Sequence, residues 1–360
     1  MDKTGGWRLK AASALAVTLA AGTAQAQSSV SLYGVLDVGI VYASKTAGAN
    51  GQNAGKSFSL MDGSVVPSLW GIKGTEDLGG GLQAKFEIES GINVANGGLN
   101  DSNGNVFGRQ TWIALDGGFG EVKMGLQYSP FFLIVYGSDP RGLTSFGSSI
   151  VPYGDSIALT AAFSANAVSY TSPNIAGFQG SAMIALGGVA GDFQMGRVYS
   201  ASLTYANGGL SVLAGYYNGN SGGTGQTPVP TTVEFDGRTL GVAYKYGPVT
   251  GKVSVVDYQV AGGFNNYVYG GGLDYQVTPF VDVNGGVWFT SDRNDTKNNS
   301  ILVGLGAQYF ISKRTSLYSQ VEVVNNKGAM NTGLSVSDSA LLTGVAGTTV
   351  GVNVGIQHTF

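Results

Sequence analysis

Stretches of about ten residues in which apolar and polar side chains alternate recur along most of this chain. The pattern is clear at Leu82–Glu89 and Tyr199–Tyr205, and it ends the chain at Val350–Phe360. Successive side chains of a β-strand point to opposite faces, so each stretch predicts a strand with one apolar and one polar face. We therefore expect an all-β protein.

The composition indicates what the apolar faces meet. Charged residues make up 11% of the chain, against roughly 25% in soluble domains. Beyond the first residues, no apolar run reaches the roughly 18 residues of a membrane-spanning helix. A closed β-barrel is the other structure that pairs every backbone group in lipid. A soluble sandwich shows the same alternation, but the low charge and the Gly-rich polar faces favour the barrel. Tyrosines that bracket apolar faces, such as Tyr33 with Tyr42 and Tyr199 with Tyr205, suit the edges of a lipid band.

The N-terminal segment has the pattern of a secretory signal peptide. Basic Lys3, Arg8 and Lys10 precede the apolar run Ala11–Ala24, and Ala24-Gln25-Ala26 supplies a small-residue cleavage site. We expect residues 1–26 to be removed and 27–360 to form one domain. The chain has no cysteine, so disulfides do not hold the exported protein together.

About sixteen strands are expected, an even number as in bacterial barrels. Short turns, such as Asp77–Gly81 and Ala206–Gly209, alternate with long polar loops: Val94–Asn105, Asn218–Glu234, Ser291–Asn299 and Asn326–Gly347. Short periplasmic turns and long outer loops are typical of these barrels. The predicted strands begin near Ser29, Val65, Leu82, Val106, Glu121, Ala167, Gln179, Val198, Leu210, Phe235, Thr250, Asn266, Val281, Ser300, Ser316 and Thr348.

The longest connection, from Tyr128 to about Asn166, differs from the other loops because it is rich in aromatic residues. A loop this apolar is unlikely to extend into solvent, and the barrel interior is available to it. We expect it to fold into the lumen. Its aromatic residues are Phe131, Phe132, Tyr136, Phe146 and Tyr153.

Several segments together resemble the general trimeric porins of β-proteobacteria. The resemblance spans the chain beyond the signal peptide and rests on the combination, since each segment alone is a weak signal. The segments are Ser31–Asp37, Trp70–Leu82, Phe107-Gly108-Arg109-Gln110, Val168–Pro173 with Gly177-Phe178, and Gly355–Phe360.

The resemblance implies a sixteen-stranded antiparallel transmembrane barrel in the Gram-negative outer membrane, three per functional trimer, with the third loop folded into the lumen. It implies a water-filled channel for passive diffusion of small hydrophilic solutes and ions. The C-terminal aromatic Phe360 would be the signal read by the outer-membrane assembly machinery. Membrane lipid and lipopolysaccharide are the other expected partners.

The resemblance also implies a constriction in which acidic loop residues face arginines on the wall, and here this chain departs from the family. The family's arginines are replaced by Leu69 in Ser68-Leu69-Trp70-Gly71, by Leu126 in Gly125-Leu126-Gln127, and by Phe163, whereas Arg109 is kept. We therefore expect a weakened anion preference or a mild cation preference. The other expected constriction residues are Lys73, Lys85, Glu87 and Glu89 on the wall and Asp139 and Asp155 on the loop.

Three other functions remain open: a substrate-selective channel for a less polar solute, a structural or adhesive barrel, and a membrane-embedded hydrolase. His358 is the single histidine, so we predict no catalytic site, metal or cofactor. The formal net charge is −3 and no basic block is present, which argues against a nucleic-acid partner.

Overall fold

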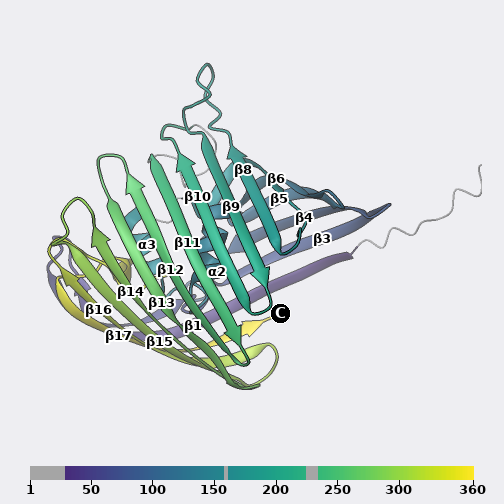
Figure 1. Ribbon diagram of the computed structural model, residues 1–360. Coiled ribbons are helices and arrows are strands. Elements are labelled where there is room, and N and C mark those ends of the chain that lie inside the picture. Colours follow the sequence, from purple (N-terminus) through teal and green to yellow (C-terminus); the bar gives the residue numbers. More distant parts are fainter. Residues whose placement is uncertain (1–28, 158–160, 224–233) are drawn as a thin grey trace, which may run out of the picture.

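The computed structural model describes residues 29–157, 161–223 and 234–360, so the predicted signal peptide lies outside the described residues (Figure 1). Within these ranges the chain forms seventeen antiparallel strands and three short helices, α2–α4. In chain order they are β1 (Ser29–Ala47), β2 (Asn53–Asp62), β3 (Leu69–Gly79), β4 (Leu82–Gly91), β5 (Gln110–Gly117), β6 (Gly120–Tyr128), α2 (Pro130–Ser138), α3 (Ile150–Ile157), β7 (Phe163–Thr171), β8 (Phe178–Ala185), β9 (Val198–Asn207), β10 (Leu210–Gly219), β11 (Phe235–Tyr246), β12 (Val249–Val260), β13 (Asn265–Thr278), β14 (Val281–Asp292), β15 (Asn299–Phe310), β16 (Thr315–Lys327), α4 (Ser339–Leu342) and β17 (Gly347–Thr359).

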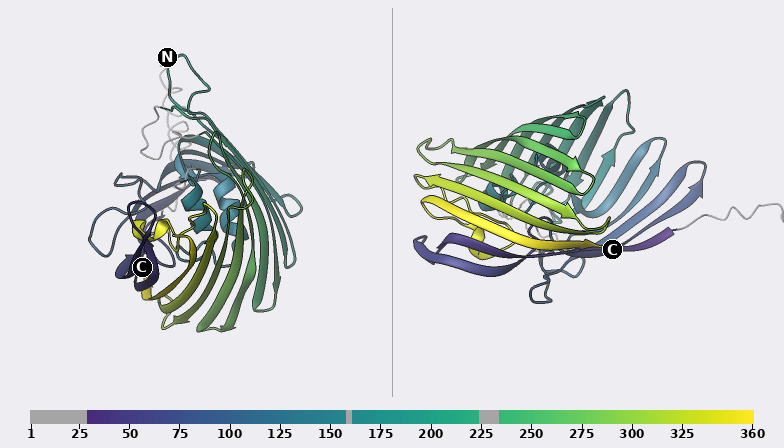
Figure 2. Two further views of the ribbon diagram at one scale, coloured as in Figure 1. Left: turned by 90° about the vertical axis from the view of Figure 1, so that its left-hand side faces the viewer. Right: turned by 90° about the horizontal axis from the view of Figure 1, so that it is seen from below.

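The sheet closes on itself between its first and last strands. Neighbouring strands pair in chain order, and one edge of β1 pairs with β17 from Val35↔Thr359 to Ala43↔Gly351. The other edge of β1 pairs with β3 in its first half and with β2 in its second half. Because β2 and β3 follow one another along the same edge, they share one place in the ring. The protein is a closed antiparallel barrel of sixteen strand positions (Figure 2).

The C-terminal residue contributes to this closure. The backbone N–H of Gly34 donates to the carbonyl of Phe360 at 3.1 Å, and the N–H of Phe360 donates to the carbonyl of Gly34 at 3.0 Å. A Cβ at position 34 would lie 2.3 Å from the Phe360 ring. Gly34 therefore leaves the space in which the terminal ring packs beside the first strand.

Each predicted strand start agrees with the structure within four residues, including Val65, which lies four residues before the start of β3. Strand β2 was not predicted: the pairing with β1 already starts at Asn53 and is interrupted at 63–68. The alternation pattern gave no sign that a strand position would be built from two pieces.

Asp37 of β1 holds this interruption in place. Its side chain is fully buried and accepts hydrogen bonds from the N–H groups of Val65 and Val66, each at 2.9 Å, and from the Tyr318 hydroxyl at 2.7 Å. The Ser68 hydroxyl donates to its carbonyl and accepts from its N–H. The carboxylate thus replaces the strand partner that these backbone groups lack.

Exposed apolar side chains follow the outer face of the barrel. On β1 they are Leu32, Leu36 and Ile40, whereas the alternate residues face inward. Tyr33 was expected among the outward tyrosines, and this was wrong: its hydroxyl donates to Glu87 and Glu89. Tyr33 and Tyr42 are nine positions apart, so they lie on opposite faces. Among the described residues, no helix is both long and apolar enough to cross a membrane.

Replacing Asp37 tests the role of its carboxylate. Asp37→Leu keeps a similar size but leaves buried N–H donors without acceptors, so we expect the free energy of unfolding to fall by at least about 2 kcal/mol. Urea unfolding of detergent-folded protein, followed by circular dichroism, measures the change. The control Asp77→Leu alters an exposed turn aspartate that accepts one hydrogen bond from Gly79. Equal stability of the two variants would contradict the assignment.

Candidate functional site

The segment between β6 and β7 begins with helix α2, which packs against the β9–β12 wall. Ser129 caps the helix by accepting from the Phe132 N–H at 3.1 Å, and Pro130 follows in the first turn. Phe131 is fully buried, with ring centroids 6.2 Å from Phe235 and 6.5 Å from Tyr258. Figure 2 shows the helices on the side that the strands enclose.

Arg141 fixes the far part of the same segment to the β14–β16 wall. Its guanidinium donates to Asn284 Oδ1 at 2.9 Å, to Gln320 Oε1 at 2.6 Å and to the carbonyls of Phe146 and Gly147. The fully buried carboxyl group of Glu322 lies nearby on β16. The segment therefore crosses the interior from the β9–β12 wall to the β14–β16 wall.

Glycines on the inner wall make room for this crossing. A Cβ at Gly304 would lie 2.2 Å from the Gly147 carbonyl oxygen, and one at Gly241 would lie 2.4 Å from Ser138 Cβ. Side chains there would push the segment away from the wall. The glycine content of this chain thus serves the docking of the loop as well as the turns.

The connection between β16 and β17 folds onto the same segment. The Val336 N–H donates to the Ser145 carbonyl at 3.1 Å, and the Gly147 N–H donates to the Leu334 carbonyl at 3.2 Å. Leu334 and Leu341 are 2% and 3% exposed. The bounds predicted for this loop, Asn326–Gly347, agree with the structure, but its apolar residues are buried instead of facing outer solvent.

A cavity of about 570 Å³ lies between the crossing segment and the wall formed by β1 and β3. Most of its lining is apolar, and its polar lining includes Asn100, Asp101 and Arg109. Of the ten residues expected at the constriction, it contains Leu69, Arg109 and Phe163. Its apolar lining includes Val35, Leu69, Phe132, Leu133, Tyr136 and Phe163.

Arg109 is 5% exposed, and acceptors occupy its guanidinium. Nε donates to Glu89 Oε1 at 2.8 Å, one terminal nitrogen contacts the Asp101 carboxylate, and the other donates to the Tyr128 hydroxyl at 2.6 Å. Desolvation raises the pKa of Asp101, although the charge of Arg109 opposes that rise. One guanidinium thus faces two carboxylates, and the cluster carries no free positive charge.

The remaining wall residues also engage each other. Glu87 accepts from the Tyr33 hydroxyl at 2.5 Å, and the Lys73 ammonium lies 4.8 Å from the centroid of the Tyr33 ring. Lys85 is paired with Asp116, with Glu121 3.8 Å from its ammonium. Lys73 and Glu87 lie beside the Arg109 cluster, whereas Lys85 belongs to a separate ion-pair group.

The structure does not bring the other expected residues into the cavity. Asp139 is 1% exposed, and its carboxylate accepts from the N–H groups of Arg141, Leu143 and Ser149, so it organises the loop backbone. Leu126 pairs with Thr111 on the face that carries Ile113 and Met124, both exposed on the outside. Asp155 belongs to α3, but its side chain lies outside the described residues.

Sequence reasoning missed Asp101, Arg141 and Leu133, and it named Tyr136 only among the aromatic residues of the loop expected in the lumen. Asp101 lies in a polar loop eight residues before Arg109 and gave no signal of its own. Leu133 and Tyr136 stand in an apolar run that predicted burial, yet they are 51% and 54% exposed. They lie on the cavity side of α2 because the opposite face of the helix, with Phe131, Ile134 and Val135, packs against the β9–β12 wall.

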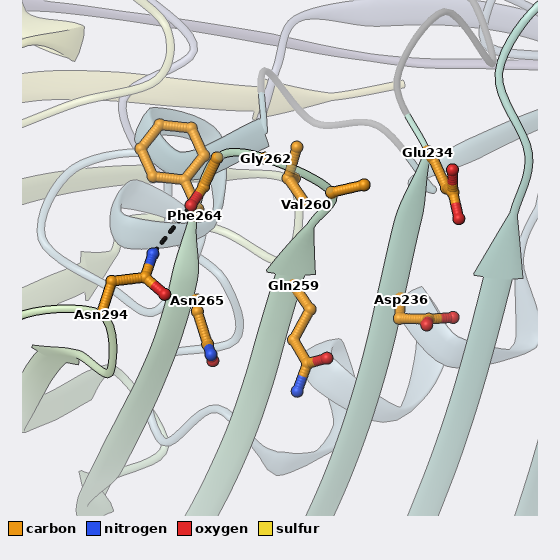
Figure 3. A pocket seen from close by; sticks show the side chains of 10 residues that line it. Glu234, Asp236, Gln259, Val260, Gly262, Phe264, Asn265 and Asn294 are labelled. Atoms are coloured by element: carbon orange, nitrogen blue, oxygen red, sulfur yellow. Dashed lines mark hydrogen bonds between the residues drawn. The ribbon is translucent and has the colours of Figure 1, made fainter.

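A second hollow, of about 410 Å³, opens at the long-loop ends of β11–β13 (Figure 3). Glu234, Asp236, Gln259 and Asn265 contribute carboxylates and amides, and Asn294 donates to the Gly263 carbonyl at 2.9 Å. No three Asp, Glu, His or Cys side chains of the described ranges are grouped to hold a metal ion. Asp236 and Gln259 alternate with the inward-facing Phe235 and Tyr258, so the hollow lies on the outer face of the strands, near one end of the barrel.

A closed barrel with an apolar exterior and loops folded inside it defines a membrane pore. Residues 11–329 match the family model described as Gram-negative porin, and the chain belongs to this family. It is 31% identical to an outer membrane porin protein of Bordetella pertussis, over 94% of this chain and 96% of that protein. It is 29% identical to outer membrane porin protein 32 of Delftia acidovorans, over 96% and 98%. The solved anion-selective porin from Comamonas acidovorans superposes with a TM-score of 0.79 at 27% identity, over 93% of this chain and all of that one.

The chain is thus an outer-membrane porin, a channel for passive diffusion. The names of its relatives are those of channels and not of enzymes.

The docking of the crossing segment can be tested at Gly304. In Gly304→Val the added side chain collides with the Gly147 carbonyl, so we expect the loop to move from the wall and single-channel conductance to become larger and more variable. The control Gly180→Val is made where a Cβ would have no neighbour closer than 3.9 Å. A folded Gly304→Val channel with parental conductance would contradict this placement of the loop.

Proposed function

We propose that this porin is a general diffusion channel with weakened anion preference or a mild preference for cations. The observation that carries the proposal is the arrangement around Arg109, where one guanidinium is held between Glu89 and Asp101. A charge compensated at contact distance contributes little field to the channel. The guanidinium of Arg109 therefore presents no unpaired positive charge to the cavity.

The wall next to Arg109 supports the same conclusion. Leu69, where the family resemblance implies an arginine, lines the cavity and pairs with Val35 across the strands. An apolar pair there provides no positive potential for a passing anion. The Comamonas porin is described as anion-selective, so we propose that the two channels differ in ion preference.

The biogenesis and assembly of the porin are part of the proposal. We propose that residues 1–26 are removed, that Phe360 is read by the outer-membrane assembly machinery, and that three barrels associate among lipid and lipopolysaccharide. The Phe360 ring is 41% exposed in the single barrel, so it is available for recognition. N-terminal sequencing of the membrane form, expected to begin at Gln27, tests the cleavage.

Single-channel recording of the refolded protein tests the pore itself. We expect stable conductance that appears in groups of three steps at each insertion, because the trimer inserts as a unit. Osmotic swelling of liposomes with sugars of increasing size should show a falling permeation rate. A folded protein without conductance would instead favour a structural or adhesive barrel.

Restoring a positive charge at Leu69 tests the proposed ion preference. Leu69→Arg adds an uncompensated charge to the cavity wall, so we expect the reversal potential in a KCl gradient to shift toward the anion side. Gln276→Arg adds the same charge at an exposed site near the short turn after β13 and serves as control. Equal shifts in the two variants, or none, would show that position 69 does not control selectivity.

A further inference from the structure

We propose that the cavity beside the crossing segment binds small solutes that carry an aromatic ring and no negative charge, and that such solutes permeate through it. This inference rests on the proposed channel function and names a class of solute for it. The channel would then combine general diffusion with a weak binding site.

The first argument is the exposed apolar surface inside the pore. Helix α2 buries Phe131, Ile134 and Val135 against the wall, yet it leaves Leu133 and Tyr136 about half exposed on the cavity side. Apolar surface kept in contact with water is less favourable than the same surface buried. A bound apolar group would remove that cost.

The second argument is the shape and lining of the cavity. Its volume of about 570 Å³ lies within the roughly 300–1,000 Å³ of small-molecule sites, which are also mostly apolar with a few polar groups. Val35 and Leu69 form its wall side, and Leu133 and Tyr136 form part of its loop side. A flat ring inserted between these sides contacts apolar groups on both faces.

The third argument is the arrangement of aromatic rings at the cavity. Tyr128 lies between Phe132, with centroids 5.3 Å apart, and Phe163, with centroids 5.0 Å apart. Both phenylalanines line the cavity together with Tyr136. Aromatic pairs at such separations stabilise each other beyond the burial of their area, so a ring-bearing solute extends a cluster that already exists.

The charges around the cavity decide which aromatic solutes fit. The donors of Arg109 are engaged by Glu89, Asp101 and Tyr128, so a solute carboxylate meets no free guanidinium there. It would meet the carboxylate of Asp101, which lines the cavity. An ammonium group is favoured by this carboxylate and by the faces of the nearby rings. Uncharged and cationic rings are therefore accepted, and anionic rings are disfavoured.

Block of the ion current by three probes tests this specificity. Phenethylammonium carries the ring and a positive charge, propylammonium lacks the ring, and 3-phenylpropionate carries the ring with a negative charge. We expect half-block by phenethylammonium at a concentration about tenfold lower than by either other probe, a ratio that corresponds to ~1.4 kcal/mol. Equal half-block concentrations for phenethylammonium and propylammonium would overturn the inference.

Variants locate the block. Leu133→Asn removes apolar surface from the cavity, so we expect the tenfold preference for phenethylammonium over propylammonium to be lost. Leu186→Asn, at a residue that is 47% exposed and outside the cavity lining, is the matched control and should keep the preference. Tyr136→Asn gives a second measurement at the cavity should Leu133→Asn fail to insert.

The outcomes separate the two proposals. Absence of current from the unmodified protein would contradict the proposed channel. Normal current with ring-independent block, or with a preference that Leu133→Asn and Tyr136→Asn leave intact, would contradict the binding site alone.

Discussion

The structure depends on one constraint: in lipid, every backbone N–H and carbonyl needs a partner within the protein. The chain meets it by pairing β1 with β17 and by fixing Phe360 to Gly34 through two backbone hydrogen bonds. Where the ladder is broken, at 63–68, the carboxylate and backbone of Asp37 supply the missing partners. The closed ring then provides an enclosed space in which loops can fold.

The loops inside the ring are held by packing on one wall and by hydrogen bonds on the other. Phe131 packs among the aromatic residues of β10–β12, and Arg141 bonds to Asn284 and Gln320 across the barrel. Glycines such as Gly304 allow the backbones to approach closely. The connection between β16 and β17 folds onto the segment between β6 and β7 and forms a second layer of loop there. The cavity beside β1 and β3 is the space that these contacts leave, so its chemistry is set by residues from distant parts of the chain.

The alternation of side chains predicted the strands because it reflects the two faces of a barrel wall, and the aromatic content of Tyr128–Asn166 marked the unusual loop. The interruption at 63–68 could not be predicted, since it depends on a hydrogen-bonded contact between Asp37 and residues about thirty positions later. The inward position of Tyr33 could have been found by counting residues from Tyr42. At the site, Leu69, Arg109 and Phe163 were expected and line the cavity. The neutralisation of Arg109 by Asp101 was not expected, because it requires a particular conformation of the loop that carries Asp101. Leu126 was expected at the constriction, but it lies opposite Thr111 on the outer face.

We propose that Arg109, held by Glu89, Asp101 and Tyr128, supplies no free positive charge to the cavity, although the chain resembles a family with arginine-lined constrictions. The reversal potential of the unmodified protein in a KCl gradient across a planar bilayer measures this directly. We predict a potential near zero or on the cation side. A strong anion-selective potential, maintained at low ionic strength where surface charges act most strongly, would contradict it.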